Sequence, residues 1–312
     1  MKPNVSIYEM MMDQLNAMAV FVAVADCGGF SAAARALRVP LPTVSRKVAD
    51  LEARLGTALL NRTSRRVALT EQGRRYLEDC RRILETVEDA GRRAAGEFST
   101  PRGELTLTAP IGFGRIHMLP IVADFLREHP EISVRLLLLD RVVSLIEEGV
   151  DIAVRIGDLP DSSLVAVRAG SIGFVVCGSP DYLAARGTPR TVRDLAGHDT
   201  ISVTALLPQD GWLMRGKTGF EPVPIHPRLS VTTAEAGIDA AERGLGLVRV
   251  RSYQAERALA DGRLVEVLGE LQPRATALSL VYPGARLVPA KLRAFLDFAT
   301  PRLRTQFARP AP

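Results

Sequence analysis

Two basic side chains interrupt an apolar row in the stretch LPTVSRKVADLEARLG, residues 41–56. The apolar row has helical spacing and consists of Val44, Val48, Leu51 and Leu55. It predicts one buried helix face, and Arg46 and Lys47 lie off that face. Arginine can form a bidentate contact with guanine or with a phosphate group, and lysine makes a point contact with phosphate. The pair therefore has the chemistry of a polyanion contact, although a solvated helix face explains the same pattern.

Basic residues are concentrated around this stretch. Residues 30–75 contain ten arginines and lysines against three acidic residues, whereas the whole chain of 312 residues carries 40 basic and 35 acidic residues. Such a concentration is the electrostatic footprint of a polyanion binder. Charge alone does not separate nucleic acid from an acidic membrane surface.

Short helices must position the basic pair. Apolar spacing predicts a first helix from Leu15 to Ala25, which Gly28-Gly29 would stop. A second helix, SAAARALR, is expected to begin with Ser31 as its N-terminal cap, and a third to begin near Pro42. A helix, a tight turn and a helix form a helix-turn-helix, whose second helix enters the major groove of DNA.

The segment ALLNRTSRRVALTEQG, residues 58–73, predicts a small hairpin whose arginines reach a DNA backbone or minor groove, with Thr70 capping the next helix. That helix is expected over residues 71–98, before the break at residues 99–103. Its apolar seam predicts dimerisation, although so short a seam can instead pack on its own chain. The seam residues are Tyr76, Cys80, Ile83, Val87, Ala90 and Ala94.

Residues 13–97 resemble the LysR-type transcriptional regulators through FVAVADCGGFSAAARAL, TVSRKVADLEARLG, LLNRTSRRVALTEQG and the long helix. The resemblance implies a winged helix-turn-helix at residues 13–70, an antiparallel dimer of linker helices at residues 71–98 and a tetrameric assembly. Family members commonly have Ser-Gln where this chain has Pro40-Leu41, so a capping hydroxyl and a polar side chain are missing and Leu41 is expected to meet a thymine methyl. The DNA-binding candidates are Ser31, Arg35, Leu41, Thr43, Ser45, Arg46, Lys47, Asp50, Arg62, Arg65 and Arg66.

Residues 103–305 alternate strand-like runs with helical patterns, which predicts an α/β domain with mainly parallel sheet. The strand-like runs are GELTLTAP, ISVRLLLLD, VDIAVRIG, GFVVCG and ALSLVY. The helical patterns span Leu119 to His129, Val142 to Glu148, Ala234 to Arg243 and Pro289 to Leu303. FLREHPEISVRLLLLD, EEGVDIAVRIGDLPDSSLVA, GSPDYLAARG and ERGLGL resemble the family's effector-binding region, a two-lobed fold similar to type II periplasmic binding proteins.

Ligands of open α/β folds bind at the carboxyl ends of strands, beside helix N-termini. This rule predicts an effector site formed by Thr108, Pro110, Ile111, Gly157, Ser202, Thr204, Thr232 and Thr233. Each hydroxyl serves equally well as a cap or a loop hydrogen bond. Arg155 is a candidate partner for an acidic ligand or for an internal carboxylate such as Asp151. Where family members commonly have a proline after the GLG strand, this chain has Val250-Arg251.

Several function classes lack support in the sequence. There is no GxSxG, HExxH, phosphate-cradling loop or GxGxxG after a strand, so we expect neither catalysis nor a cofactor. Three cysteines and four histidines lack ligand spacing, which predicts no metal. Buried thiols are favoured over a redox switch, and a surface role for His117 is favoured over a role near the expected cleft. No run approaches the ~18 apolar residues of a spanning helix, and no secretory signal is evident, so we expect a cytoplasmic protein without a membrane partner.

The sequence thus predicts a sequence-specific DNA-binding transcriptional regulator with a small-molecule effector. The expected partners are the double-stranded DNA of a promoter operator, further copies of the chain as a dimer or tetramer, RNA polymerase and an effector for which an organic acid is one candidate. A solute-binding protein with a basic extension is an alternative, disfavoured by the complete helix-turn-helix and wing. A third alternative, a nonspecific DNA-compacting protein, predicts little discrimination between DNA sequences.

Overall fold

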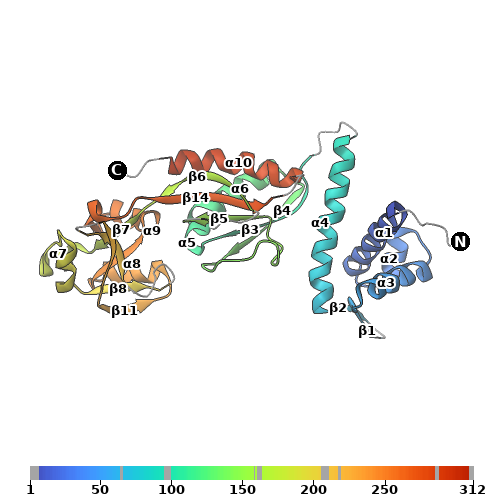
Figure 1. Cartoon of the computed structure of the whole chain (residues 1–312), viewed down its shortest axis with the longest axis horizontal. Coiled ribbons are helices and arrows are strands. Elements are labelled where there is room, and N and C mark those ends of the chain that lie inside the picture. The colour runs from blue at the N-terminus through green and yellow to red at the C-terminus, as the bar shows by residue number, and fades with distance from the viewer. Residues whose placement is uncertain are drawn as a thin grey trace. The chain divides into compact units, whose positions relative to one another are not determined.

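The chain divides into two compact units, Met1–Thr100 and Pro101–Pro312 (Figure 1). The computed structural model describes residues 7–63, 66–94, 100–157, 159, 164–204, 211–216, 219–284 and 288–308. Each unit buries its own set of apolar side chains, so each has a separate core.

Three helices form most of the N-terminal unit: α1 (Ile7–Asp26), α2 (Phe30–Leu37) and α3 (Leu41–Leu55). The prediction that Ser31 caps α2 is wrong. The N-cap lies two residues earlier, at Gly29, because Gly28 has a positive φ of 70° and Gly29 is extended. Ser31 is therefore an exposed residue of the first turn.

The start of the third helix, α3, is set by two prolines. Pro40 is the extended N-cap and Pro42 lies in the first turn, close to the predicted start. Val44, Val48 and Leu51 are buried against α1, as their spacing predicts. The predicted burial of Leu55 is wrong, because α3 ends at this residue and its side chain is 38% exposed.

A short hairpin follows, formed by β1 (Leu60–Thr63) and β2 (Arg66–Leu69), and leads into α4 (Glu71–Ala94). The Thr70 hydroxyl accepts a hydrogen bond from the Gly73 amide at 2.8 Å, so the predicted cap is confirmed. The same hydroxyl donates to the Ala58 carbonyl at 2.8 Å. From α3, Glu52 Oε1 accepts from the amides of Leu59 and Leu60 at 2.8 and 3.1 Å. The base of the hairpin is thereby attached to both α3 and α4.

The C-terminal unit has two lobes, each built around a five-stranded sheet (Figure 1). Lobe 1 has the strand order β4-β3-β5-β14-β6, and its strands are β3 (Gly103–Ala109), β4 (Ile132–Leu138), β5 (Ile152–Ile156), β6 (Leu164–Ile172) and β14 (Thr276–Pro283). Its helical segments are α5 (Ile111–Phe113), the π-helix η1 (Gly114–Met118), α6 (Leu119–Glu128) and α10 (Ala290–Phe307).

Lobe 2 has the strand order β11-β8-β12-β7-β13. Its strands are β7 (Phe174–Gly178), β8 (Thr200–Val203), β11 (Pro227–Val231), β12 (Leu247–Arg251) and β13 (Val265–Val267), with a separate hairpin of β9 (Trp212–Arg215) and β10 (Phe220–Val223). Its helical segments are α7 (Pro180–Arg186), η2 (Val192–Gly197), α8 (Ala234–Glu242), α9 (Ser252–Ala260) and η3 (Gly269–Leu271).

The five strand-like runs are all strands, but both sheets are mixed rather than mainly parallel. The chain crosses from lobe 1 to lobe 2 between β6 and β7, and it returns between β13 and β14. Strand β14 is antiparallel to β5 and β6, and β7 is antiparallel to β12 and β13. The two crossings therefore add antiparallel strands to sheets whose other described pairs are parallel.

One predicted helix is absent from the described structure. The segment from Val142 to Glu148 forms turns, whereas the other three helical patterns correspond to α6, α8 and α10. Val143 and Leu145 are buried beside β5 and β14, while Val142 and Ile146 are exposed. This irregular loop forms one wall of the cavity described below. In the part of the chain that is described, no helix is both long enough and apolar enough to cross a membrane.

Candidate DNA-binding surface and effector cavity

The helix α3 presents a polar face away from the core of the N-terminal unit. Arg46 and Asp50 are exposed, and Thr43 and Ser45 are half-buried. Leu41, the first residue of the helix, is 44% exposed. These five side chains occupy the N-terminal two-thirds of α3, which is the part of a recognition helix that meets base edges.

The two members of the basic pair differ in their surroundings. Lys47 Nζ lies 3.6 Å from Asp13 Oδ1, and Arg54 Nη2 lies 2.9 Å from Asp13 Oδ2. Asp13 thereby connects α1 to α3, a contact that the sequence did not reveal. Among the described residues Arg46 has no such ion pair, so it is the member of the pair that is available to a partner.

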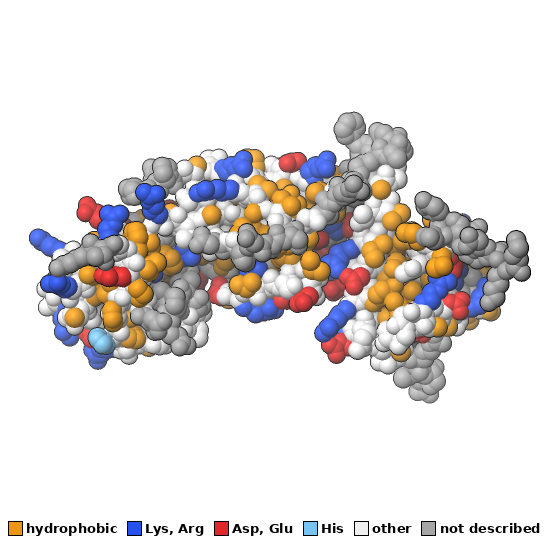
Figure 2. Space-filling view, in the orientation of Figure 1, with side chains coloured by type: hydrophobic (Ala, Val, Ile, Leu, Met, Phe, Trp, Pro, Cys, Tyr) orange, Lys and Arg blue, Asp and Glu red, His pale blue; other side chains and the backbone are white. Residues whose placement is uncertain are grey.

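The remaining DNA-binding candidates lie on α2 and the hairpin. Ser31 and Arg35 are exposed on α2. Arg62 and Arg66 belong to β1 and β2 on either side of the hairpin tip, but Arg65 and the side chains of Arg62 and Arg66 lie outside the described residues. Figure 2 shows that basic side chains are also scattered over the visible face of the C-terminal unit, among acidic and apolar ones, so total charge alone does not locate the DNA-binding surface.

Sequence reasoning missed Arg38 as a candidate. It is exposed at the end of α2, in the turn directly before α3, and it has a left-handed backbone with φ of 55°. This conformation is costly for a residue with a side chain. It is held in place by hydrogen bonds that the Arg38 backbone amide donates to the carbonyls of Ala34 and Arg35. The turn that leads into α3 thus carries an exposed arginine.

The residues of the apolar seam of α4 lie in two different environments along the helix. Tyr76 and Cys80 pack in the core of the N-terminal unit, and the Tyr76 ring lies 6.0 Å from that of Phe21 on α1. For these two residues the alternative of packing on the same chain holds, and their assignment to a dimer seam is wrong. Ile83 and Val87, one to two turns further on, are 40% and 47% exposed. Ala90 is half-buried, and the side chain of Ala94 lies outside the described residues.

Two of the three cysteines are buried, as predicted. Burial raises the pKa of Cys80 to about 11 and that of Cys177 to about 12, so both remain thiols. Cys27 is exposed at the end of α1, so its predicted burial is wrong.

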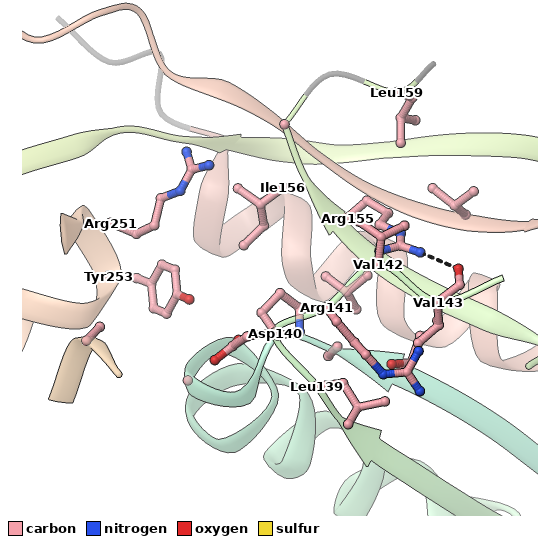
Figure 3. A pocket seen from close by; sticks show the side chains of 18 of the residues that line it. Leu139, Asp140, Arg141, Val142, Val143, Arg155, Ile156, Leu159, Arg251 and Tyr253 are labelled. Carbon is pink, nitrogen blue, oxygen red and sulfur yellow. Dashed lines mark hydrogen bonds between the residues drawn. The ribbon is translucent and has the colours of Figure 1, made fainter. Parts of the chain in front are cut away.

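A cavity of about 610 Å³ lies between the two lobes of the C-terminal unit (Figure 3). Lobe 1 contributes the ends of β3 and β5 and the loop after β4, and lobe 2 contributes the first turns of α8 and α9. Three of the predicted effector residues line this cavity: Thr108, Pro110 and Gly157. The other five do not line it: Ile111, Ser202, Thr204, Thr232 and Thr233.

These five residues lie outside this cavity, to which lobe 2 contributes the first turns of α8 and α9 and the end of β12, so their part in an effector site stays a prediction. The Thr233 hydroxyl caps α8 by accepting from the Ala236 amide at 3.3 Å. The Thr204 hydroxyl donates to the Val231 carbonyl at 3.2 Å. The side chain of Ile111 is exposed and its amide donates to Asp140 Oδ1 at 3.0 Å. The hydroxyls of Thr233 and Thr204 thus serve as a helix cap and a loop hydrogen bond, which are roles that threonine fills in many proteins.

Several polar residues that line the cavity were not foreseen: Asp140, Arg141, Glu235, Arg251, Tyr253 and Gln254. The single sequence signal among them was Val250-Arg251, which departs from the proline usual in the resembled family. Tyr253 and Gln254 follow on α9, and burial raises the pKa of Tyr253, so its hydroxyl keeps its proton.

Two of the three arginines that line the cavity, Arg141 and Arg155, have partners in lobe 1. Arg141 donates two hydrogen bonds to the Glu148 carboxylate, at 2.8 and 2.7 Å, which neutralises its charge. Arg155 Nη2 donates to the Val143 carbonyl at 2.8 Å, shown dashed in Figure 3. The proposed pairing of Arg155 with Asp151 is wrong, because Asp151 Oδ2 accepts from the Thr106 amide instead.

His117 lies behind this cavity rather than on the surface, so its predicted surface role is wrong. The side chain is 4% exposed, and its ring centroid lies 5.4 Å from that of Tyr253 and 4.8 Å from that of Phe307. Gln306 Nε2 lies 2.9 Å from His117 Nδ1. The other ring nitrogen, His117 Nε2, has no partner among the described residues. The imidazole is therefore packed within an aromatic cluster.

This environment predicts a pH dependence of stability. Burial lowers the pKa of His117, partly offset by Glu256 and Gln306, so the unfolded chain binds a proton more readily than the folded one. We expect the free energy of unfolding of the C-terminal unit to fall as pH drops below about 6.5, the ordinary value for histidine. Urea unfolding of the wild type and of His117→Phe from pH 7.5 to 5.5 measures this. An equal pH slope in both proteins would contradict the assignment.

The described residues contain no group of three or more His, Cys, Asp or Glu side chains placed to hold a metal ion. A winged helix-turn-helix joined to a two-lobed ligand-binding fold defines the class of effector-responsive DNA-binding regulators. Family models agree: residues 15–74 match the bacterial regulatory helix-turn-helix protein, lysR family, and residues 99–304 match the LysR substrate binding domain. The chain belongs to the LysR family of transcriptional regulators.

Relatives of this chain include an HTH-type transcriptional regulator of Xanthomonas campestris, which is 35% identical over 94% of this chain and 86% of its own length. CrgA of Neisseria meningitidis is a LysR-type transcriptional regulator whose solved structure is 33% identical, covers 92% of this chain and 98% of its own, and has a TM-score of 0.60. The structure of AphB, a Vibrio cholerae virulence activator, is 25% identical, with coverages of 91% and 98% and a TM-score of 0.58. The protein is accordingly a DNA-binding regulator with an effector-binding domain, and not an enzyme.

Proposed function

We propose that α3 reads an operator in a promoter, with Arg46 as its principal base or phosphate contact and the hairpin contacting the flanking backbone. The observation that carries this proposal is the exposure of Arg46 without an ion-pair partner among the described residues, on a helix whose opposite face is buried. Leu41, exposed at the first position of the helix, is suited to contact a thymine methyl. As a regulator of transcription, the protein acts in the cytoplasm, where bacterial promoters lie.

The proposed assembly is a homodimer, or a tetramer made of such dimers. The exposed apolar side chains of Ile83 and Val87 on α4 support this part of the proposal, because the core of the chain's own unit does not cover them. A dimer places two recognition helices on one operator, which is how two half-sites are read together.

The proposed effector is an organic acid bound in the cavity between the lobes. Its binding favours one arrangement of the lobes and so changes how the assembled DNA-binding units contact DNA or RNA polymerase. The support is the position of the cavity, which has residues of both lobes in its wall. A ligand that touches both lobes binds the closed arrangement more tightly than the open one.

A binding titration tests the regulatory function. The full-length protein is titrated against DNA from upstream of its own gene and against a scrambled DNA of equal length and composition, at near-physiological salt. We expect discrimination of ~10³-fold or more. Equal affinity for both DNAs, and for DNA surrounding neighbouring genes, would favour nonspecific DNA binding over an operator-reading regulator.

A further inference from the structure

The two lobes offer different chemistry to the cavity. Apolar side chains dominate the wall from lobe 1, including Leu139, Val142, Val143 and Ile156 (Figure 3). The wall from lobe 2 is mainly polar, and its side chains come from α8, α9 and the end of β12. A ligand that fills both parts must therefore have a polar head and an apolar body.

Arg251 is the cation of the polar wall. Its Nη1 donates to Thr276 Oγ1 at 2.8 Å, and the Thr276 hydroxyl in turn donates to the Ile172 carbonyl. Its guanidinium carbon lies 4.0 Å from the centre of the Phe174 ring. These contacts fix the side chain but occupy one of its five N–H donors, and no carboxylate pairs with it among the described residues.

A second arginine strengthens the positive charge at this place. Arg249 lies two residues earlier on β12, is 2% exposed, and has its guanidinium carbon 3.9 Å from the same Phe174 ring. Its Nε donates to the neutral amide oxygen of Gln272 at 3.0 Å. Burial and the nearby charge of Arg251 lower the pKa of Arg249 to about 10. Arg249 is buried, Arg251 is half-buried and lines the cavity, and neither has a described carboxylate partner, so an anion in the cavity would stabilise their positive charge.

The cavity wall also carries negative charge near Tyr253. Asp140 and Glu235 both line the cavity, and both act on the Tyr253 hydroxyl in the direction that raises its pKa. Asp140 already accepts the Ile111 amide, and Glu235 has Arg115 at 3.8 Å. A second carboxylate on a ligand would be repelled wherever it lay beside these two groups. The polar wall thus suits one negative charge and disfavours two.

We propose that the effector is a monocarboxylate with an apolar body, whose carboxylate binds Arg251 and the Tyr253 hydroxyl and whose body lies on the lobe 1 wall. This assignment rests on the proposal that the cavity is the effector site. It also has a mechanical consequence, because Arg251 bonds Thr276 and lies on the Phe174 ring, and these two residues belong to the two segments where the chain crosses between the lobes. A ligand carboxylate that binds Arg251 therefore acts directly on the connection between the lobes.

Calorimetric titration of the full-length wild-type protein tests the ligand class. The probes are hexanoate and 3-phenylpropanoate, each compared with its neutral amide, with the matching dicarboxylate adipate and with the zwitterion 2-aminohexanoate. We expect at least one monocarboxylate to bind, and its amide to bind on the order of 10- to 100-fold more weakly, because the amide forfeits the charge-assisted contact. The proposal is overturned if the amide binds equally well, if adipate or 2-aminohexanoate binds more tightly than hexanoate, or if no probe binds.

Matched variants locate the contact. Arg251→Gln should weaken the monocarboxylate by on the order of 10- to 100-fold, whereas Arg141→Gln, which removes a cavity arginine already neutralised by Glu148, should change affinity by less than about threefold. Arg251→Lys keeps the charge without the planar fork and should be intermediate. Equal losses in the Arg251 and Arg141 variants would overturn the assignment, and the wild-type comparison of acid with amide remains decisive if Arg251→Gln fails to fold.

The DNA titration on the same samples separates the two levels of proposal. Specific DNA binding without discrimination between acid and amide would remove the monocarboxylate assignment and leave the regulator intact. Discrimination between acid and amide without specific DNA binding would remove the operator proposal and leave the ligand class standing.

Discussion

Replacing Gly73 with alanine is expected to destabilise the N-terminal unit by about 3 kcal/mol or more and to abolish specific DNA binding. A Cβ at this position would lie 2.0 Å from the Leu59 carbonyl oxygen and 2.8 Å from its carbon. The obstacle is backbone, so no side-chain rotation relieves it. Either α4 or the base of the hairpin must move, and the bonds of Thr70 and Glu52 at this junction are lost with it.

Hydrogen exchange by mass spectrometry and the operator titration measure this effect, because they separate the two units. We expect faster exchange in α1, α3 and α4 of the Gly73→Ala protein, with the exchange of the C-terminal unit unchanged. Gly91→Ala is the matched control, since it makes the same substitution on the same helix where nothing lies within 4 Å. The control should be neutral or stabilised by up to about 1 kcal/mol. If the Gly73→Ala protein has the same hydrogen exchange and DNA affinity as the wild type, the junction between the hairpin and α4 is not rigid.

Replacing Arg46 with alanine is expected to weaken specific DNA binding by about 1–3 kcal/mol if the side chain reads a base. The protein's own stability should change little, because Arg46 is exposed and makes no ion pair with a described residue. A phosphate contact would instead lower affinity for operator and scrambled DNA alike, and would reduce the salt dependence by about one counterion. Titrations of both DNAs at several salt concentrations distinguish the two roles.

Arg54→Ala is the matched control for Arg46. It removes the same charge from α3, but from its last turn, where the guanidinium pairs with Asp13 rather than with a ligand. We expect Arg54→Ala to retain discrimination between operator and scrambled DNA and to lose only a small, salt-dependent part of the affinity. If the two variants behave alike, Arg46 contributes general positive charge and does not read the operator.

The sequence was most informative where local chemistry determines structure. The helix-turn-helix and its hairpin follow from helical spacing, from prolines at a helix start and from a threonine cap, which all act within a few residues. Even there, Ser31 was assigned as a cap because serine is a good one, although the flexible Gly28-Gly29 pair lets the helix begin earlier. Tyr76 and Cys80 have the spacing of a dimer seam, and a sequence does not tell whether such a face meets its own core or a second chain.

The cavity shows what only the tertiary structure decided. The sequence by itself determined the family, the α/β lobes and three cavity residues at strand ends, Thr108, Pro110 and Gly157. It did not bring Arg251 and Tyr253 to them, because these residues lie roughly a hundred positions or more along the chain, in the other lobe. The two crossings between the lobes create that proximity, and they also made both sheets mixed. Charge pairing was decided there too: Glu148 neutralises Arg141, while the fold leaves Arg251 available to a ligand.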